Sequence, residues 1–447
     1  MAIFTAIGSG QTLTGTDNPD LFILSATTSL SVIGQGGADT VDIDTVSAEV
    51  ILQNSFVTLK GGPDRIAHRG VIFKSVVQLG AGGDTMTVSE QAGLPGIIDD
   101  SVIKAGDGND NIQVMDEVID STIEMGAGAD SLYIDDLTSG VISMGAGADT
   151  LRIDQIRDSS VINLGGGADL ATTDGVLVES SLLAAGAGSD TVSVEEIIFR
   201  STVQLGGDAD KLFARSVIES TINGGAGGDT IVISGSLLGS TVYGDAGNDS
   251  IVLLDPISPF DGELESDSAR VFGGDGADTI FAGPGFEGEL NVFGGHGADL
   301  IQLTRTSEVD VKYTNASESN VNSFDTLQAI DAGTTAIARI NVTAVLPQEV
   351  KIASSIIGAN FNTDNSGEVT FKAGVGASIE DRVSVLNEDL NAGQFVLFDA
   401  EGSQFVFMAG NDASSTDDDI LIRVADNAVV GGLSTGGNAS VFLEFFS

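Results

Sequence analysis

The chain has 447 residues, 65 acidic against 18 basic side chains, a formal net charge of −47 and 42% hydrophobic residues. This charge makes nucleic acid and anionic membranes poor partners because both repel it, and the hydrophobic content predicts a folded chain rather than a disordered one. The sequence has no cysteine for disulfides or thiolate metal sites, and its two histidines are too few for a zinc site.

Residues 1–34 precede the first complete repeat of the chain. The stretch "MAIFTAIGSGQTLTGTDNPD" has no positively charged start and no long apolar run, so we expect neither a secretory signal peptide nor insertion into a membrane. Because the end of a repeat array has to be covered, we predict an N-terminal cap over 1–34.

A glycine-rich turn that ends in aspartate recurs from residue 35 to residue 305. The stretch "MGAGADTLRIDQIRDSSVINLGGGAD" (Met144–Asp169) contains two such turns, twenty residues apart. Most steps of the series are 19 to 21 residues, and glycine stands two positions before every aspartate but one, where Asp208 replaces it. The aspartates of the series are Asp39, Asp64, Asp84, Asp110, Asp130, Asp149, Asp169, Asp190, Asp210, Asp229, Asp249, Asp278 and Asp299.

The residues between two glycine turns alternate between apolar and polar, as in half-buried strands. After the turn at Asp149 comes "TLRID" (150–154), then a second turn "QIRDS" (155–159), then "SVINL" (160–164). One such unit cannot bury its apolar face alone, but stacked units can. The sequence therefore predicts an all-β fold, a parallel β-roll or β-helix solenoid of about 20-residue coils over 35–305.

Stacking places the aspartates of successive turns in a column, where their charges repel one another. Calcium relieves this repulsion because it takes about six to eight carboxylate and carbonyl oxygens in flexible geometry, whereas magnesium prefers strict octahedral sites. We expect each ion to lie between two neighbouring turns. Only one edge of the coil is glycine–aspartate, so we expect one calcium column. The predicted ligands are Asp39, Asp84, Asp110, Asp130, Asp149, Asp169, Asp190, Asp229, Asp249, Asp278 and Asp299, with Asp64 and Asp210 as doubtful members.

The turns "GGDGAD" (273–278) and "GGHGAD" (294–299) resemble the Gly-Gly-x-Gly-x-Asp repeat of RTX calcium-binding proteins, and "GDAGND" (244–249) is a close variant. The resemblance covers roughly 270 residues and implies a calcium-binding β-roll. The chain departs from the family pattern, which places such turns on both edges, about nine residues apart.

Residues 306–447 contain alternating strands instead of glycine turns and predict a C-terminal β-sandwich-like domain. Within it, "QFVLFDAEGSQFVFMAG" predicts a hairpin closed at Asp399–Ser403. The final "SVFLEFFS" (440–447) resembles the uncleaved C-terminal signal of type I secretion substrates. Low cytosolic calcium would leave such repeats unfolded for export, and external calcium would fold them.

Three classes of function remain open. The first is a secreted, extracellular, calcium-dependent structural protein that is not an enzyme and binds copies of itself in a surface layer or filament, with cell-surface polysaccharide as a further partner. The second is an adhesin, or a fibre or decoration protein of a virion. The third is a polysaccharide-acting β-helix enzyme, for which the sequence offers only a sparse set of basic residues on the coil. They are Arg152, Arg157, Arg200 and Arg215.

Overall fold

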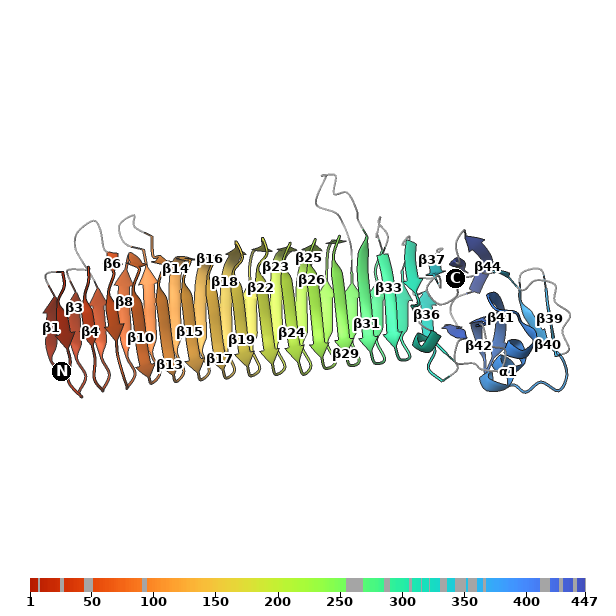
Figure 1. Ribbon diagram of the computed structural model, residues 1–447, viewed down its shortest axis with the longest axis horizontal. Coiled ribbons are helices and arrows are strands. Elements are labelled where there is room, and N and C mark those ends of the chain that lie inside the picture. Colours follow the sequence, from red (N-terminus) through yellow and green to blue (C-terminus); the bar gives the residue numbers. More distant parts are fainter. Residues whose placement is uncertain are drawn as a thin grey trace. The chain divides into compact units, whose positions relative to one another are not determined.

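The computed structural model describes residues 1–6, 9–24, 28–43, 51–90, 95–254, 268–284, 290–304, 308–314, 316–320, 322–329, 336–341, 351–352, 360–364, 367–410, 419–425, 429–436 and 440–446. The chain divides into two compact units, Met1–Arg215 and Ser216–Ser447. Both contain parallel stacked coils of about 20 residues, about 14 turns in all, which confirms the predicted solenoid (Figure 1).

In the first unit, each coil contributes a strand to each of two parallel sheets, here called sheet A and sheet B. Sheet A contains β1 (Ile3–Ala6), β3 (Leu21–Leu24), β5 (Thr40–Ile43), β8 (Arg65–Arg69), β11 (Thr85–Ser89), β14 (Asn111–Ile119), β16 (Ser131–Thr138), β18 (Thr150–Arg157), β20 (Leu170–Thr173) and β23 (Thr191–Phe199). Sheet B contains β2 (Thr12–Thr14), β4 (Ser31–Ile33), β7 (Phe56–Thr58), β10 (Val76–Ala81), β13 (Val102–Asp107), β15 (Thr122–Ala127), β17 (Val141–Ala146), β19 (Val161–Gly166), β22 (Leu182–Ala187) and β24 (Thr202–Gly207).

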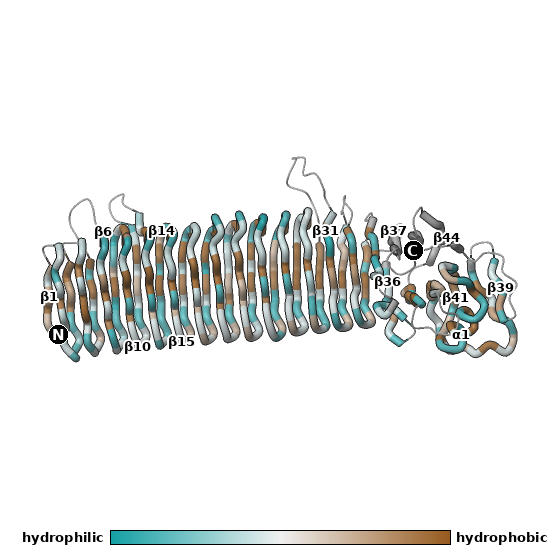
Figure 2. The backbone as a smooth tube through the Cα atoms, viewed as in Figure 1, coloured by the Kyte–Doolittle hydropathy of each residue, from teal (hydrophilic) through white to brown (hydrophobic). Residues whose placement is uncertain are grey.

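The coils align residue for residue, so that like side chains stack on like. Ile123 of β15 pairs with Ile142 of β17, and Ile142 pairs with Ile162 of β19. All three side chains are fully buried. Figure 2 shows the hydrophobic segments of successive coils side by side. Branched aliphatic side chains suit these ladders because they pack well on a pleated surface.

The strands of sheet A are longer than predicted where the sequence suggested a second turn. β18 continues to Arg157, because Ile156 is buried and pairs with Leu137 and Leu177 of the neighbouring coils. The turn itself narrows to Asp158 and Ser159, whose φ angles are 54° and 63°. The ends of these long strands pair with two short strands, β12 (Ile98–Asp99) with β14 and β21 (Leu177–Val178) with β18 and β23. The short strands β6 (Ile51–Gln53) and β9 (Val71–Phe73) continue the same ladder, with β6 paired to β9 and β9 to β12.

The segment predicted as a cap, 1–34, has the same parallel pairing as the coils that follow it. Ile3 pairs with Leu21, and Leu21 pairs with Thr40. The turn between β2 and β3 places Asp20 at the same corner of the coil as Asp39, because the Asp20 amide hydrogen bonds to the Asp39 carboxylate. The described residues of this segment, 1–6, 9–24 and 28–34, therefore belong to coils of the stack.

The second unit repeats this architecture, and β25 (Lys211–Ile218) leads into it. Parallel pairing continues beyond residue 305, from β34 to β36 and from β33 through β35 to β37. The strands are β26 (Thr221–Ala226), β27 (Thr230–Ile233), β28 (Leu237–Leu238), β29 (Thr241–Ala246), β30 (Ser250–Leu253), β31 (Ala269–Asp275), β32 (Thr279–Ala282), β33 (Leu290–His296), β34 (Leu300–Leu303), β35 (Glu308–Lys312), β36 (Asp325–Ala329) and β37 (Ala336–Asn341), with the 3-10 helix η1 (Ala316–Glu318) before β36.

Further strands then extend both sheets, by the parallel pairing of β36 with β43 and by antiparallel pairings among β41 to β43 and among β37, β44 and β45. β36 pairs with β43, which pairs with the hairpin of β42 and β41; that hairpin is the predicted one, with Ala400 opposite Ser403. β37 pairs with β45, and β45 with β44. The bounds are β38 (Lys351–Ile352), β39 (Phe361–Thr363), β40 (Val369–Phe371), β41 (Gln394–Ala400), β42 (Ser403–Met408), β43 (Ile420–Val424), β44 (Val429–Gly436) and β45 (Ser440–Phe446).

One helix in this region, α1 (Ile379–Asp389), was not predicted. Ser378 caps it by accepting a hydrogen bond from the Asp381 amide, and Val383 and Leu386 are buried in the cluster that contains Phe398 of the hairpin. Among the residues that the structure describes, no helix has the length and apolarity needed to cross a membrane.

Candidate metal site in the glycine turns

The glycine turns stack so closely that, in a typical turn, a side chain at either of two positions would collide with the preceding coil. In the turn at Asp110, Gly106 and Gly108 have φ angles of 120° and 135°. A Cβ atom there would lie 1.7 Å and 1.6 Å from carbonyl oxygens of the preceding coil. The backbone also bonds along the stack, since the Gly108 amide donates to the Ala127 carbonyl of the next coil at 2.7 Å. Neighbouring turns are therefore already joined by their backbones.

The aspartates form the predicted column, but inside the coil and joined by hydrogen bonds. The Asp130 amide donates to Asp149 Oδ1 at 2.8 Å, and the Asp149 amide donates to Asp169 Oδ1 at 2.8 Å. Each of these side chains is at most 3% exposed. The same bond, 2.6–3.1 Å long, joins consecutive aspartates from Asp20 to Asp210 in the first unit and from Asp229 to Asp325 in the second.

Asp64 and Asp210, the doubtful members, occupy the same place as the others. Both carboxylates accept the amide of the preceding aspartate, at 2.6 Å and 2.7 Å, and both side chains are buried. Asp208, which replaces a glycine in the turn of Asp210, also has a positive φ, 76°, although the glycines at this position in the adjacent turns, Gly188 and Gly227, have φ angles of 116° and 142°. The exception in sequence therefore does not interrupt the column.

Two aspartates that the sequence analysis did not assign, Asp20 and Asp325, carry protein donors on both oxygens. Asp20 Oδ2 accepts from the Thr16 amide at 2.6 Å and the Thr16 hydroxyl at 2.9 Å. Asp325 Oδ2 accepts from the Tyr313 hydroxyl at 2.9 Å. The spacing of Asp20, nineteen residues before Asp39, was the signal that could have placed it in the series.

For eleven of the aspartates between these two, the second carboxylate oxygen is buried without a hydrogen-bond partner. This holds for Oδ2 of Asp39, Asp64, Asp84, Asp110, Asp130, Asp149, Asp169, Asp190, Asp249, Asp278 and Asp299. Burial raises the pKa of Asp130 to about 6 and that of Asp249 to about 7, and neighbouring column carboxylates contribute to both shifts. The amide bond to Oδ1 opposes the shift without cancelling it. Each such oxygen needs either a proton or a cation as its partner.

The presence of aspartate rather than asparagine along the column is what binding of a cation would require. Each column position from Asp20 to Asp325 is aspartate and none is asparagine, although an asparagine oxygen would accept the same amide bond. Within the described residues, no three carboxylate or imidazole side chains converge on one point. An ion here would therefore be held by one Oδ2 together with backbone carbonyls, which is a ligand set that calcium accepts.

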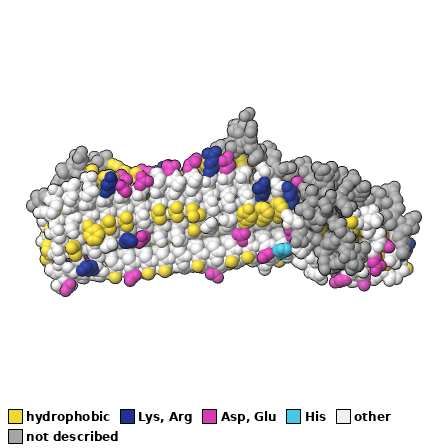
Figure 3. Space-filling view, in the orientation of Figure 1, with side chains coloured by type: hydrophobic (Ala, Val, Ile, Leu, Met, Phe, Trp, Pro, Cys, Tyr) yellow, Lys and Arg dark blue, Asp and Glu magenta, His cyan; other side chains and the backbone are white. Residues whose placement is uncertain are grey.

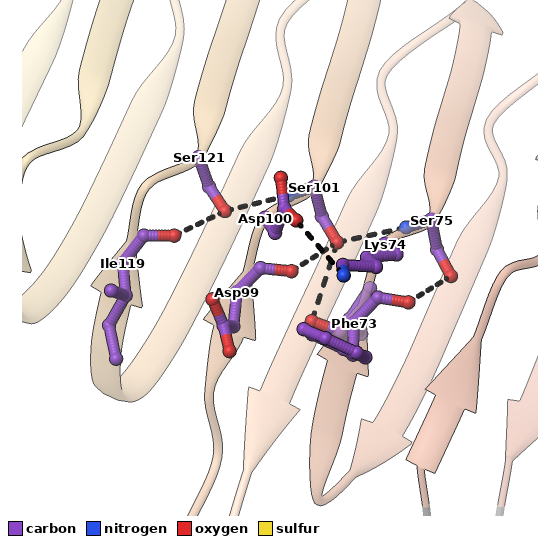
Figure 4. Close-up of polar contacts among 9 residues, drawn as sticks. Phe73, Lys74, Ser75, Asp99, Asp100, Ser101, Ile119 and Ser121 are labelled. Atoms are coloured by element: carbon purple, nitrogen blue, oxygen red, sulfur yellow. Dashed lines mark hydrogen bonds and ion pairs between the residues drawn. The ribbon is translucent and has the colours of Figure 1, made fainter.

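The opposite edge of the coil carries a serine column with no charge at the equivalent position. The Ser75 amide donates to the Ser101 hydroxyl oxygen at 3.0 Å, and the Ser101 amide donates to that of Ser121 at 2.9 Å (Figure 4). Each hydroxyl in turn donates to a carbonyl of its own coil, as Ser101 does to Asp99 at 2.7 Å. These serines are therefore hydrogen bonded as both donor and acceptor.

Three of the four arginines that a polysaccharide lyase would use, Arg152, Arg157 and Arg200, lie beside acidic side chains on the coil surface, with Arg200 Nη1 3.9 Å from Glu179 Oε1. Arg157 Nη1 lies 3.1 Å from an Asp136 carboxylate oxygen, and Arg152 pairs with both Asp154 and Asp174. Neutralised in this way, they add little positive field for an acidic substrate. No protein-family model and no curated protein matches this chain.

Proposed function

We propose that this protein is an extracellular structural protein that binds calcium and assembles with copies of itself into a surface layer or filament. The observation that carries the proposal is the column of buried aspartates whose second oxygens have no partner. Calcium supplies that partner, because it binds carboxylate and carbonyl oxygens together and tolerates irregular geometry. In a calcium-poor cytosol the column repels itself, and outside the cell the ion stabilises the folded coils.

The outer surface of the first unit supports association between copies. An outward row of sheet B contains Phe56, Val76, Val102, Thr122, Val141, Val161 and Leu182, aligned coil by coil. Phe56, Val141 and Val161 are 43%, 42% and 37% exposed. Rows of hydrophobic side chains are visible on the face in Figure 3. A straight, mostly apolar row on a regular surface matches the same row of a second copy.

The test is negative-stain microscopy and circular dichroism of the full chain during a calcium titration, with chelator reversal and magnesium at equal ionic strength as the control. Sheets or filaments that appear with calcium and dissolve with chelator support the proposal. Protein that folds with calcium yet remains monomeric at high concentration refutes assembly and favours an adhesin. A fold that ignores calcium refutes the metal column.

A further inference from the structure

The thirteen predicted turns differ at the residue five positions before the aspartate. Eight of them carry a buried apolar residue there and five carry glycine. The apolar residues are Leu59, Leu79, Ala105, Met125, Met144, Leu164, Ala185 and Leu205, which precede the aspartates from Asp64 to Asp210. The glycines are Gly34, Gly224, Gly244, Gly273 and Gly294, which precede Asp39, Asp229, Asp249, Asp278 and Asp299.

This position borders the second carboxylate oxygen. A Cβ atom built on Gly34 would lie 2.3 Å from Asp39 Oδ2, and one built on Gly294 would lie 2.4 Å from Asp299 Oδ2. In the glycine turns, a side chain at this position would therefore collide with Oδ2 where it now lies. In the eight apolar turns that side chain is leucine, methionine or alanine, at most 1% exposed. Carbon cannot ligate a hard cation, so these side chains occupy the place where further oxygen ligands would have to stand.

In three glycine turns of the second unit, a second oxygen points to the same place. The Cβ point of Gly244 lies 2.5 Å from Asp249 Oδ2 and 2.4 Å from the carbonyl oxygen of Gly273 in the next coil. The same pair of oxygens lies 2.5 and 2.3 Å from the point at Gly273 (Asp278 Oδ2, Gly294 O) and 2.7 and 2.6 Å from the point at Gly224 (Asp229 Oδ2, Gly244 O). The missing side chain thus leaves a cradle with a carboxylate and a carbonyl oxygen on it.

The other two glycine turns lack the second oxygen. Near the Cβ point of Gly34, the next coil places a methyl group of Leu59 at 3.1 Å instead of a carbonyl oxygen. Near that of Gly294, the three nearest atoms all belong to the Asp299 side chain. Only the turns of Asp229, Asp249 and Asp278 therefore combine an absent side chain with two converging oxygens.

We infer that calcium enters only these three consecutive turns of the second unit, and that the eight apolar turns of the first unit bind none. The inference rests on the proposed function and narrows it. Asp249 and Asp278 are 2% and 1% exposed, and their Oδ2 atoms have no hydrogen-bond partner, so an ion there replaces no existing bond. Since calcium takes about six to eight oxygens, the two that converge supply part of its coordination shell. In the apolar turns, the role of each aspartate is to accept the hydrogen bond from the backbone amide of the aspartate in the preceding coil.

The experiment is equilibrium dialysis of the chelator-stripped full chain against radioactive calcium. We expect about three ions per chain. Asp278→Asn and Asp249→Asn should each lower the number by one, whereas Asp149→Asn and Asp169→Asn, in apolar turns, should leave it at three. Asparagine keeps the oxygen that accepts the neighbouring amide, so the ladder remains, and circular dichroism of each variant verifies the fold.

The outcomes separate the inference from the proposed function. Binding of eleven to thirteen ions, or loss of an ion in Asp149→Asn, overturns the division between turns but leaves a calcium-binding protein. Binding of no ions contradicts the proposed function itself. Three ions that persist in both Asp249→Asn and Asp278→Asn place the sites outside these turns and also overturn the inference.

Discussion

Replacing Asp130 by asparagine tests whether the column aspartates of the first unit are buried as described. Asp130 is 2% exposed, its Oδ1 accepts the Asp110 amide at 2.8 Å, and burial raises its pKa from 3.8 to about 6. At about 1.4 kcal/mol per pKa unit, this shift corresponds to about 3 kcal/mol against the ionised folded state. The turn lies at the surface of the coil, where solvent screens charge, so about half of that, ~1.5 kcal/mol, is the expected effect.

The direction in which the stability of the protein changes with pH follows from proton binding by Asp130. Because the folded pKa lies above the unfolded one, the folded state binds more protons between pH 4 and 6. The contribution of Asp130 to stability is therefore complete below pH 4 and is lost as the pH rises through 6. Asparagine does not titrate, so the variant should gain ~1.5 kcal/mol relative to the native chain between pH 4 and pH 7.5.

The assay is urea unfolding in chelator at a series of pH values, followed by circular dichroism. Asp107→Asn, which removes an exposed charge from a neighbouring turn, is the matched control. Its free energy of unfolding should stay close to that of the native chain at every pH. A difference between Asp130→Asn and the native chain that stays constant from pH 4 to 7.5 would refute the reasoning. A difference of the opposite sign would show that the folded state stabilises the ionised carboxylate of Asp130, which also contradicts the raised pKa.

Two further changes test the packing. Gly106→Ala places a Cβ atom 1.7 Å from a carbonyl oxygen of the preceding coil, at a φ of 120°, and should lower the free energy of unfolding by at least about 3 kcal/mol. The control is Gly207→Ala, whose Cβ has no atom within 4 Å and which should cost under about 1 kcal/mol. Equal losses of the two variants in urea unfolding would contradict the close stacking of the turns. Burial lowers the pKa of His68 to about 4. As the pH falls from 6.5 to 4, the imidazole binds a proton in the unfolded chain only, so the free energy of unfolding of the native chain should fall by about 3 kcal/mol. His68→Val should abolish this part of the acid dependence, and an unchanged pH profile of thermal unfolding would show that the imidazole is accessible to water.

The sequence by itself determined the coil and its repeat. The spacing of Asp149 and Asp169 and the alternation between them define a 20-residue coil, and stacking is the only way to bury its single apolar face. The hairpin at Asp399–Ser403 also followed from local pattern, because two apolar runs flank a short polar turn. In each case the information is periodic or local, and both kinds can be recognised without knowing which coils are neighbours.

Only the tertiary structure decided what the aspartates contact. The hydrogen bond from the Asp130 amide to Asp149 Oδ1 depends on how far one coil is displaced from the next, which no local pattern specifies. The same holds for Ile156, which extends β18 because neighbouring coils offer Leu137 and Leu177 as partners. The glycine at position 244 is visible in the sequence, but its meaning requires the directions of Asp249 Oδ2 and of the Gly273 carbonyl, and these are set by the stacking of the turns.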